Sequence, residues 1–213
     1  MRTMDGLVIR AATPEDQPVV HAMNDAAVPH VNALTPDQFA WLSSHADYYR
    51  VAERDGTVVG FVMAIRRGTT YWSRNYAWFT ERFPDFFYLD RVVIAPEARR
   101  GGVGRALYAD LAAFAATTWP RVTLEVNVDP PNPGSMAFHE TLGFRRVGTR
   151  ADERGAVARL CAARPGEQGQ HRSGGGEAAR GVREGGHGDE VILSGNAPTA
   201  PRPGPIVRRA TAP

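Results

Sequence analysis

The chain has 213 residues, one cysteine and a formal net charge of +2, a length that suits one domain followed by a tail. A single cysteine excludes an internal disulfide and a metal cluster built on cysteines. No apolar run approaches the length of a bilayer-spanning helix, and the N-terminus lacks a charged segment followed by an apolar core. We therefore expect a cytoplasmic protein with no membrane partner and no bound metal.

The basic excess is confined to the C-terminal end of the chain. From Arg164 onward the sequence holds seven arginines and five acidic residues, which accounts for the whole net charge. The preceding part is neutral and offers no basic groove, so we expect no nucleic acid partner. Because the end of the chain is rich in Gly, Pro, Arg and Glu, we predict a domain over residues 1–163 and a disordered tail over residues 164–213.

Two helix starts follow the first predicted strand, Leu7 to Ala12. The run Thr13-Pro14-Glu15-Asp16 offers a capping residue, a proline at the first helical position and acids in the first turn, which predicts a helix to about residue 27. Thr35-Pro36-Asp37 repeats the pattern and predicts a helix to about residue 45. The connection between the helices carries His30 and Asn32, which are candidate ligand contacts.

The next part of the chain combines a hairpin with an aromatic segment. Asp55-Gly56 lies between two β-rich runs, residues 49–53 and 57–65, and predicts a tight hairpin. Nine of the 19 aromatic residues then fall between Tyr71 and Tyr88, a composition that argues against disorder. We hold two compatible interpretations: a local aromatic core or dimer surface, and an aromatic lid over a ligand pocket, with Tyr76 and Tyr88 as contacts.

The stretch from Tyr88 to Leu111 organises the chain. Residues 88–94 are a short β-branched apolar run typical of a buried strand, and Pro96 ends it. A Gly-rich turn, residues 99–104, then opens into a segment with helical apolar spacing. A helix start of this kind binds anions through its free N–H groups. A dinucleotide fingerprint is excluded because Leu107 takes the place of its third glycine, and a nucleotide triphosphatase loop is excluded because the chain has no lysine.

The downstream segment begins with an alternating strand, residues 121–128, which carries Glu125 and Asn127. Three prolines then surround Asn132, which we expect to be extended with its amide free to reach a ligand. A short helix containing Ser135 should end at Gly143-Phe144. Residues 145–151 and 156–162 are predicted to form a final hairpin.

Two motifs resemble those of the GNAT superfamily of acetyl-CoA-dependent N-acetyltransferases. The first is the pattern Arg99-x-x-Gly102-x-Gly104, which is similar to the family's pyrophosphate-binding motif. The second, Asn132 to Phe144, is similar to the family's Asn-x-x-Ala-x-x-Phe-Tyr-x-x-x-Gly-Phe block, with His139 in place of the usual tyrosine. The resemblance covers about residues 6 to 162.

The resemblance implies an α/β fold: a mixed, mostly antiparallel twisted sheet with helices on both faces and splayed central strands. Acetyl-CoA would thread between these strands, residues 87–95 and 122–128, as co-substrate. The residues implied to bind it are Val92, Val93, Ile94, Arg99, Arg100, Gly101, Gly102, Val103, Gly104, Arg105, Asn132 and Ser135.

Three side chains are candidates for proton transfer in such a reaction. Asp90 is the candidate base, on the expectation that it shares strand parity with Val92 and Ile94; the alternative is that it pairs with a nearby arginine. Glu125 is the rival carboxylate. His139 occupies the position of the family's general acid, and the alternative is that it packs while water supplies the proton. The resemblance suggests a backbone N–H near Val93 or Ile94 as the donor to a developing oxyanion.

The function implied by the resemblance is transfer of an acetyl group from acetyl-CoA to an amine of a small molecule, by direct attack in a ternary complex. Acceptor contacts would come from His30, Asn32, Tyr76, Tyr88 and Asn127. Two other functions stay open: an acyl-CoA-binding sensor without turnover, and an N-acetyltransferase acting on proteins or peptides. We expect a monomer or a homodimer.

Overall fold

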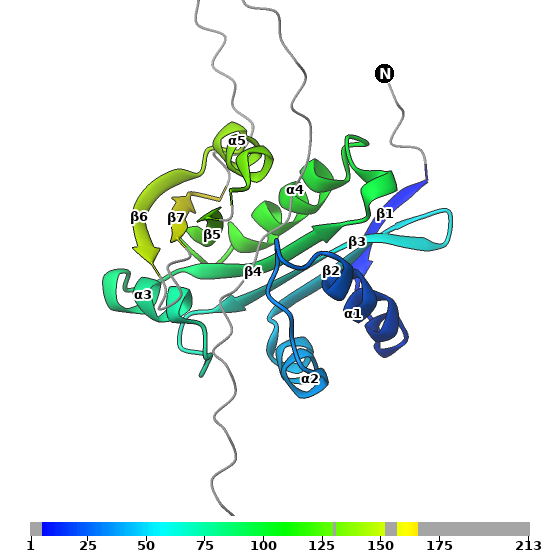
Figure 1. The fold of residues 1–213 in the computed structure, drawn as a ribbon, viewed down its shortest axis with the longest axis horizontal. Coiled ribbons are helices and arrows are strands. Elements are labelled where there is room, and N and C mark those ends of the chain that lie inside the picture. Colours follow the sequence, from blue (N-terminus) through cyan, green and yellow to red (C-terminus); the bar gives the residue numbers. More distant parts are fainter. Residues whose placement is uncertain (1–5, 130, 152–156, 166–213) are drawn as a thin grey trace, which may run out of the picture.

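The structure is a computed structural model that describes residues 6–129, 131–151 and 157–165. The predicted disordered tail, apart from residues 164 and 165, and the tip of the last predicted hairpin lie outside the described residues. Seven strands form one sheet in the order β1-β2-β3-β4-β5-β7-β6 (Figure 1). Neighbouring strands pair antiparallel except β4 and β5, which pair parallel, so the predicted sheet type is confirmed. The strands are β1 (Leu7–Ala11), β2 (Tyr48–Arg54), β3 (Thr57–Arg66), β4 (Phe87–Ile94), β5 (Val122–Asp129), β6 (Arg145–Ala151) and β7 (Val157–Ala163).

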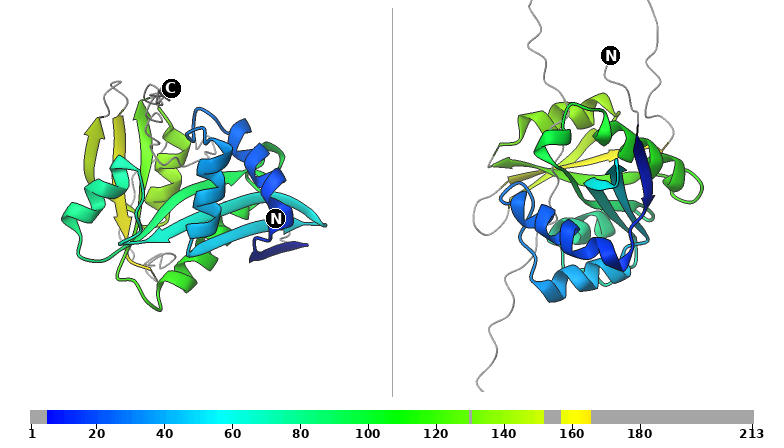
Figure 2. Two further views of the ribbon diagram at one scale, coloured as in Figure 1. Left: turned by 90° about the horizontal axis from the view of Figure 1, so that it is seen from below. Right: turned by 90° about the vertical axis from the view of Figure 1, so that its right-hand side faces the viewer.

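Helices cover both faces of the sheet (Figures 1 and 2). On one face lie α4 (Val103–Ala115) and α5 (Pro133–Thr141). On the other lie α1 (Gln17–Ala26), α2 (Pro36–His45) and α3 (Arg74–Arg82). Each face has its own buried apolar cluster, as expected for a sheet that must bury both surfaces. We call the two sides the α4 face and the α1 face.

Local sequence signals place the early elements as predicted. Thr35 caps α2, because its hydroxyl accepts a hydrogen bond from the Gln38 N–H while the Gln38 side chain accepts one from the Thr35 N–H. Thr13 and Asp16 form the equivalent capping pair, in which the Asp16 side chain accepts a hydrogen bond from the Thr13 N–H. The turn that follows, Pro14–Asp16, is a 3-10 helix that precedes α1. The hairpin of β2 and β3 turns at Asp55-Gly56, with φ values of 50° and 76°.

The aromatic segment between β3 and β4 contains a helix that was not predicted, α3. Ser73 begins it by accepting a hydrogen bond from the Tyr76 N–H. Tyr76, Phe79 and Phe86 are all buried in the apolar cluster of the α1 face. The interpretation as a local aromatic core is therefore confirmed, whereas the lid stays a prediction.

A β-bulge in β4 changes which way its side chains point. Met63 of β3 lies opposite Arg91 and the next residue, Ala64, lies opposite Leu89, so Asp90 is the extra residue. A bulge breaks the alternation of a strand. Asp90 and Arg91 consequently both contact groups on the α1 face, whereas Val92 and Ile94 pack in the cluster of the α4 face. The expected parity of Asp90 with Val92 and Ile94 is therefore wrong.

The two central strands separate soon after they meet. Strand β4 pairs with β5 only at Phe87 with Val122 and at Tyr88 with Thr123. Beyond these pairs, residues 89–94 of β4 have no partner in β5, while β5 continues antiparallel to β7 as far as Asp129. The sheet thus opens between β4 and β5, and the predicted splaying of the central strands is confirmed.

Candidate active site

The Gly-rich turn after β4 leads directly into α4. A 3-10 turn, Pro96–Ala98, precedes it. Gly102 is the N-cap of α4 and has a φ of 80°, a left-handed conformation that glycine adopts without strain. At this end of the helix, the Ala106 N–H donates a hydrogen bond to the Gly102 carbonyl. Helix geometry leaves the N–H groups of residues 103–105 without acceptors inside the helix, which suits a negatively charged ligand group.

Glu125 lies on β5, two residues beyond the last pair with β4. The Tyr88 hydroxyl donates a hydrogen bond of 2.6 Å to its Oε2 atom, whereas Oε1 is buried and has no partner among the described residues. The side chain is 1% exposed. Burial, chiefly, raises the pKa of Glu125 to about 8, since the charged form is poorly solvated there. This carboxyl group therefore exchanges a proton close to neutral pH.

Asp90 uses both of its carboxylate oxygens within the protein. Tyr71 donates its hydroxyl proton to Oδ1 at 2.6 Å, and Arg91 Nε donates to Oδ2 at 2.8 Å. Both members of this ion pair are fully buried. The pairing of Asp90 with a nearby arginine, which was the alternative to its role as base, is therefore present in the structure.

Arg91 joins the site to the α1–α2 connection. Its Nη1 donates to Asn24 Oδ1 at 2.5 Å and to the Asn32 backbone carbonyl at 3.3 Å. The sequence analysis missed Arg91, Asn24 and Tyr71. An Asp-Arg pair inside an apolar strand was the one available signal, because two charges there must be compensated in the interior.

His139 lies on the α4 face, across the sheet from the carboxylates. Its Nδ1 is 2.6 Å from the Ser135 backbone carbonyl, and its Nε2 is 2.5 Å from the Tyr108 hydroxyl. A carbonyl only accepts, so Nδ1 carries the proton and Nε2 accepts from Tyr108. Burial lowers the pKa of His139 to about 4, so the ring is neutral near pH 7. Tyr108 was not predicted.

We expect His139 to titrate near pH 4 instead of near its ordinary value of 6.5. Because the unfolded chain takes up this proton at higher pH than the native protein, the contribution of His139 to the free energy of unfolding should fall as pH drops from about 6.5 to about 4. The midpoint is measurable from the ring protons by NMR. Denaturant unfolding of His139→Phe over the same range isolates the contribution of this group. A midpoint near 6.5 would contradict the buried neutral imidazole.

Asn132 and Ser135 help to begin α5. The Asn132 Oδ1 atom accepts a hydrogen bond of 3.1 Å from the Ser135 N–H, and the Asn132 side chain is the N-cap. The expectation of an extended asparagine with its amide free is wrong, because φ and ψ are −127° and 70° and the side-chain oxygen caps the helix. Ser135 is buried and its hydroxyl is 3.3 Å from His139 Nδ1.

The predicted acceptor contacts separate into three groups. Tyr88 and Asn32 touch the network of buried charges, through Glu125 and Arg91 respectively. Tyr76 packs in the core and donates its hydroxyl to the Arg66 carbonyl. His30, in the α1–α2 connection, and Asn127, two residues after Glu125, are partly exposed.

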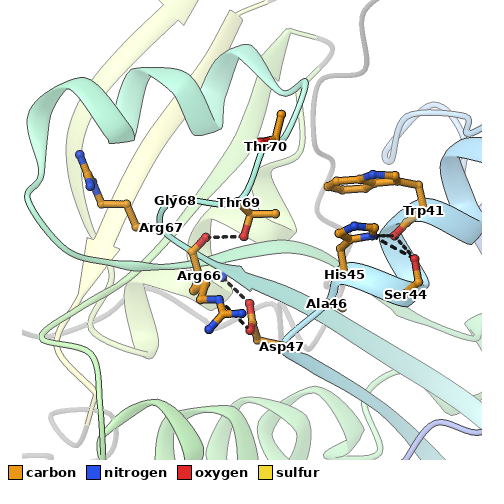
Figure 3. A pocket seen from close by; sticks show the side chains of 10 residues that line it. All are labelled: Trp41, Ser44, His45, Ala46, Asp47, Arg66, Arg67, Gly68, Thr69 and Thr70. Carbon is orange, nitrogen blue, oxygen red and sulfur yellow. Dashed lines mark hydrogen bonds and ion pairs between the residues drawn. The ribbon is translucent and has the colours of Figure 1, made fainter.

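A surface pocket of about 680 Å³ lies beside this network. Figure 3 shows the Trp41 and His45 rings together on one side and the paired Arg66 and Asp47 below. Trp41 stacks on His45 at 4.1 Å and on Tyr71 at 5.8 Å between ring centroids. Because Tyr71 bonds Asp90, one aromatic layer separates the pocket from the buried carboxylate. The lining residues are Trp41, Ser44, His45, Ala46, Asp47, Arg66, Arg67, Gly68, Thr69 and Thr70.

Within residues 6–129, 131–151 and 157–165, no three His, Cys, Asp or Glu side chains are grouped to hold a metal ion. Over the same part of the chain, none of the helices has the length and apolar character needed to cross a membrane.

The chain belongs to the acetyltransferase (GNAT) family, whose sequence model matches residues 17–144. Phosphinothricin N-acetyltransferase from Alcaligenes faecalis is 36% identical over 101 residues, which are 47% of this chain and 45% of that enzyme. The match therefore spans less than half the length of this relative. The family resemblance inferred from the two motifs is confirmed.

Two solved structures share the fold. Ard1 from Thermoplasma volcanium has a TM-score of 0.61 and 18% identity, covering 75% of this chain and 97% of that one. Arabidopsis thaliana Naa50, in complex with the bisubstrate analogue CoA-Ac-MVNAL, has a TM-score of 0.57 and 12% identity, covering 74% and 98%.

Proposed function

We propose that the protein acetylates an amine of a small molecule with acetyl-CoA as co-substrate. One observation carries this proposal: Glu125 is a buried carboxyl group with an unpartnered oxygen, two residues past the point where β4 and β5 separate. Its pKa of about 8 suits a group that accepts a proton near neutral pH.

The residues around the strand opening fit acetyl-CoA. The start of α4 would hold the pyrophosphate on the N–H groups of residues 103–105, because Gly102 carries no side chain and takes a left-handed φ. The part of β4 over residues 89–94 has no partner in β5, and this would leave backbone groups for the amides of the pantetheine arm. Acetyl-CoA supplies an activated acetyl group as a thioester, and the neighbouring Naa50 structure holds a CoA-containing analogue.

Within this site we propose Glu125 as the group that accepts the amine proton, directly or through a water molecule. Asp90 is the less suitable base, because Tyr71 and Arg91 occupy both of its oxygens. A backbone N–H near Val93 or Ile94 would donate to the oxygen of the reacting carbonyl. His139, neutral and bonded on both ring nitrogens, positions Tyr108 and α5 and leaves the final proton to water.

A small acceptor is favoured by the enclosed position of Glu125 and by the relative named phosphinothricin N-acetyltransferase. A protein or peptide acceptor is the second candidate, because the Naa50 complex contains an analogue with a peptide portion, CoA-Ac-MVNAL. An acyl-CoA sensor without turnover is the third.

Release of free CoA thiol tests the proposal, with acetyl-CoA and separate panels of small amines, amino acids and peptides. We expect acetylation within the small-molecule panels, with the product identified by mass spectrometry. Tight acetyl-CoA binding with no acetylation in any panel would favour the sensor, and product from the peptides alone would favour the protein-modifying enzyme.

Gly104→Glu should abolish acetyl-CoA binding while the protein stays folded. Gly104 is the second residue of α4 and is buried, so a glutamate there would add a negative charge at the helix start that is proposed to hold the pyrophosphate. Calorimetry measures the affinity, and circular dichroism checks the fold. Ala109→Glu, at an exposed position of the same helix, is the control. Unchanged acetyl-CoA affinity in folded Gly104→Glu would contradict the assignment of the pyrophosphate site to the start of α4.

A further inference from the structure

Three buried nitrogen atoms beside the Asp90–Arg91 pair have no hydrogen-bond partner among the described residues. They are Arg91 Nη2, Asn24 Nδ2 and Asn32 Nδ2. Both asparagine residues contact the guanidinium, because Arg91 Nη1 donates to the Asn24 side-chain oxygen and to the Asn32 backbone carbonyl. One end of the site thus holds three unpartnered N–H groups, on residues that contact one another through Arg91.

Unpaired donors of this kind are costly to the fold. A buried donor without a partner destabilises a protein by about 1–3 kcal/mol, and such groups in native proteins call for an explanation. All three atoms here are donors, and one belongs to a guanidinium that carries a full charge. The chemistry that satisfies them is a group with two or more acceptor oxygens, and an oxyanion gains most from the guanidinium fork.

The other end of the site holds the opposite kind of atom. Glu125 Oε1 is a buried acceptor without a partner. The two ends are linked, since Asp90 binds Arg91 and Tyr71, the Tyr71 ring lies 6.3 Å from the Tyr88 ring, and Tyr88 binds Glu125. Unpaired donors and an unpaired acceptor therefore lie at the two ends of one buried network.

We propose that Arg91, Asn24 and Asn32 form a subsite for an oxyanion of the acceptor, so that the substrate is an amino acid or another amine that also carries an anionic group. The inference rests on the proposed function, because the amine of the same molecule is placed at Glu125. Arg91 and Asn24 are fully buried, whereas Asn32 is partly exposed in the α1–α2 connection. The acceptor would reach the donors by displacing this connection.

The test compares amines that differ by one carboxylate. Alanine and ethylamine, histidine and histamine, tyrosine and tyramine, and lysine and cadaverine are matched pairs. Their acetylation is measured as kcat/KM, and their binding to the protein saturated with CoA is measured by calorimetry. We expect the acids to have at least about tenfold higher kcat/KM and affinity than their decarboxylated partners. This factor corresponds to the contribution of one hydrogen bond to a charged group.

Asn32→Ala is the decisive variant. It removes the unpaired amide but keeps the backbone carbonyl that binds Arg91, so the melting temperature should stay unchanged or rise. We expect about tenfold weaker binding and kcat/KM for the acids and less than a twofold change for the amines. Asn24→Asp, which keeps the oxygen that binds Arg91 and replaces the donor with a negative charge, should reduce the use of acids further. The exposed Asp25→Ala, on the same helix, is the control without effect.

The outcomes separate the subsite from the proposed function. Acids that bind better than amines and lose that advantage in Asn32→Ala support the subsite, even without turnover. If both series are acetylated alike and Asn32→Ala changes neither, the subsite is overturned but the acetyltransferase function stands. Buried water molecules would then accept the hydrogen bonds of the three N–H groups. Neither binding nor acetylation of any member overturns both.

Discussion

Glu125→Gln is expected to reduce turnover by about a hundredfold to ten-thousandfold, the range of a general base, while acetyl-CoA affinity stays within about twofold. Glutamine keeps the shape of the side chain and an oxygen for the Tyr88 hydroxyl, which now binds Oε2, but it cannot take up a proton at that position. The comparison is made at saturating acetyl-CoA with the best acceptor of the panel. Glu81→Gln, at a side chain that is 70% exposed, is the control and should match the parent.

The pH dependence gives the same prediction a second readout. Because the pKa of Glu125 is raised to about 8, the basic form increases as pH rises, and kcat/KM should climb through about pH 8. The contribution of Glu125 to stability has the opposite slope. Above about pH 4.5 the unfolded chain has released a proton that the native state still holds, so this contribution to the free energy of unfolding should fall as pH rises toward 8. Both slopes should vanish in Glu125→Gln. A Glu125→Gln variant with parental turnover would return the role of base to Asp90 or to water.

Arg91→Met is expected to lower the free energy of unfolding by about 3–5 kcal/mol, as is typical when one member of a buried ion pair is removed. Both side chains of the Asp90–Arg91 pair are fully buried. Methionine leaves Asp90 with Tyr71 as its only remaining side-chain donor among the described contacts, so the carboxylate must stay charged without compensation or bind a proton. Urea unfolding followed by circular dichroism measures the change.

Two further variants show whether the cost comes from the uncompensated charge. Arg159→Ala breaks an ion pair with Glu140 whose side chains are 28% and 61% exposed, and it should cost less than about 1 kcal/mol. Asp90→Leu combined with Arg91→Met removes both charges, and the double variant should recover part of the loss. If its loss of unfolding free energy equals the sum of the losses in Asp90→Leu and Arg91→Met measured singly, the two residues act independently and the electrostatic account is wrong.

Much of the fold could be predicted from the sequence because its signals are local. Thr35 with Gln38 marks a helix start, and Asp55-Gly56 marks a hairpin; each depends only on residues within a few positions. The Gly102 turn and α4 could also be predicted from the sequence, since a strand, a glycine and an amphipathic helix follow one another directly. The family resemblance then supplied the type of sheet and its splayed central strands, which no local signal contains.

The arrangement of the site could not be predicted in the same way. The bulge at Asp90 depends on the register of β4 against β3, and a single extra residue was enough to reverse the assumed direction of its side chain. The contact of Arg91 with Asn24 joins residues 67 positions apart. The raised pKa of Glu125 and the lowered pKa of His139 could not be predicted either, because both shifts depend on burial by distant elements.

The short ladder between β4 and β5 has a consequence for how the domain holds together. Backbone pairing joins β1, β2, β3 and β4 into one sub-sheet and β5, β7 and β6 into another. Among the described residues, two residue pairs join the two sub-sheets. Cohesion across this seam therefore depends on side chains packed from above and below. A pantetheine arm lying in the seam would take the place of a missing strand. In the proposed complex, the co-substrate would be a structural component of the sheet as well as a reactant.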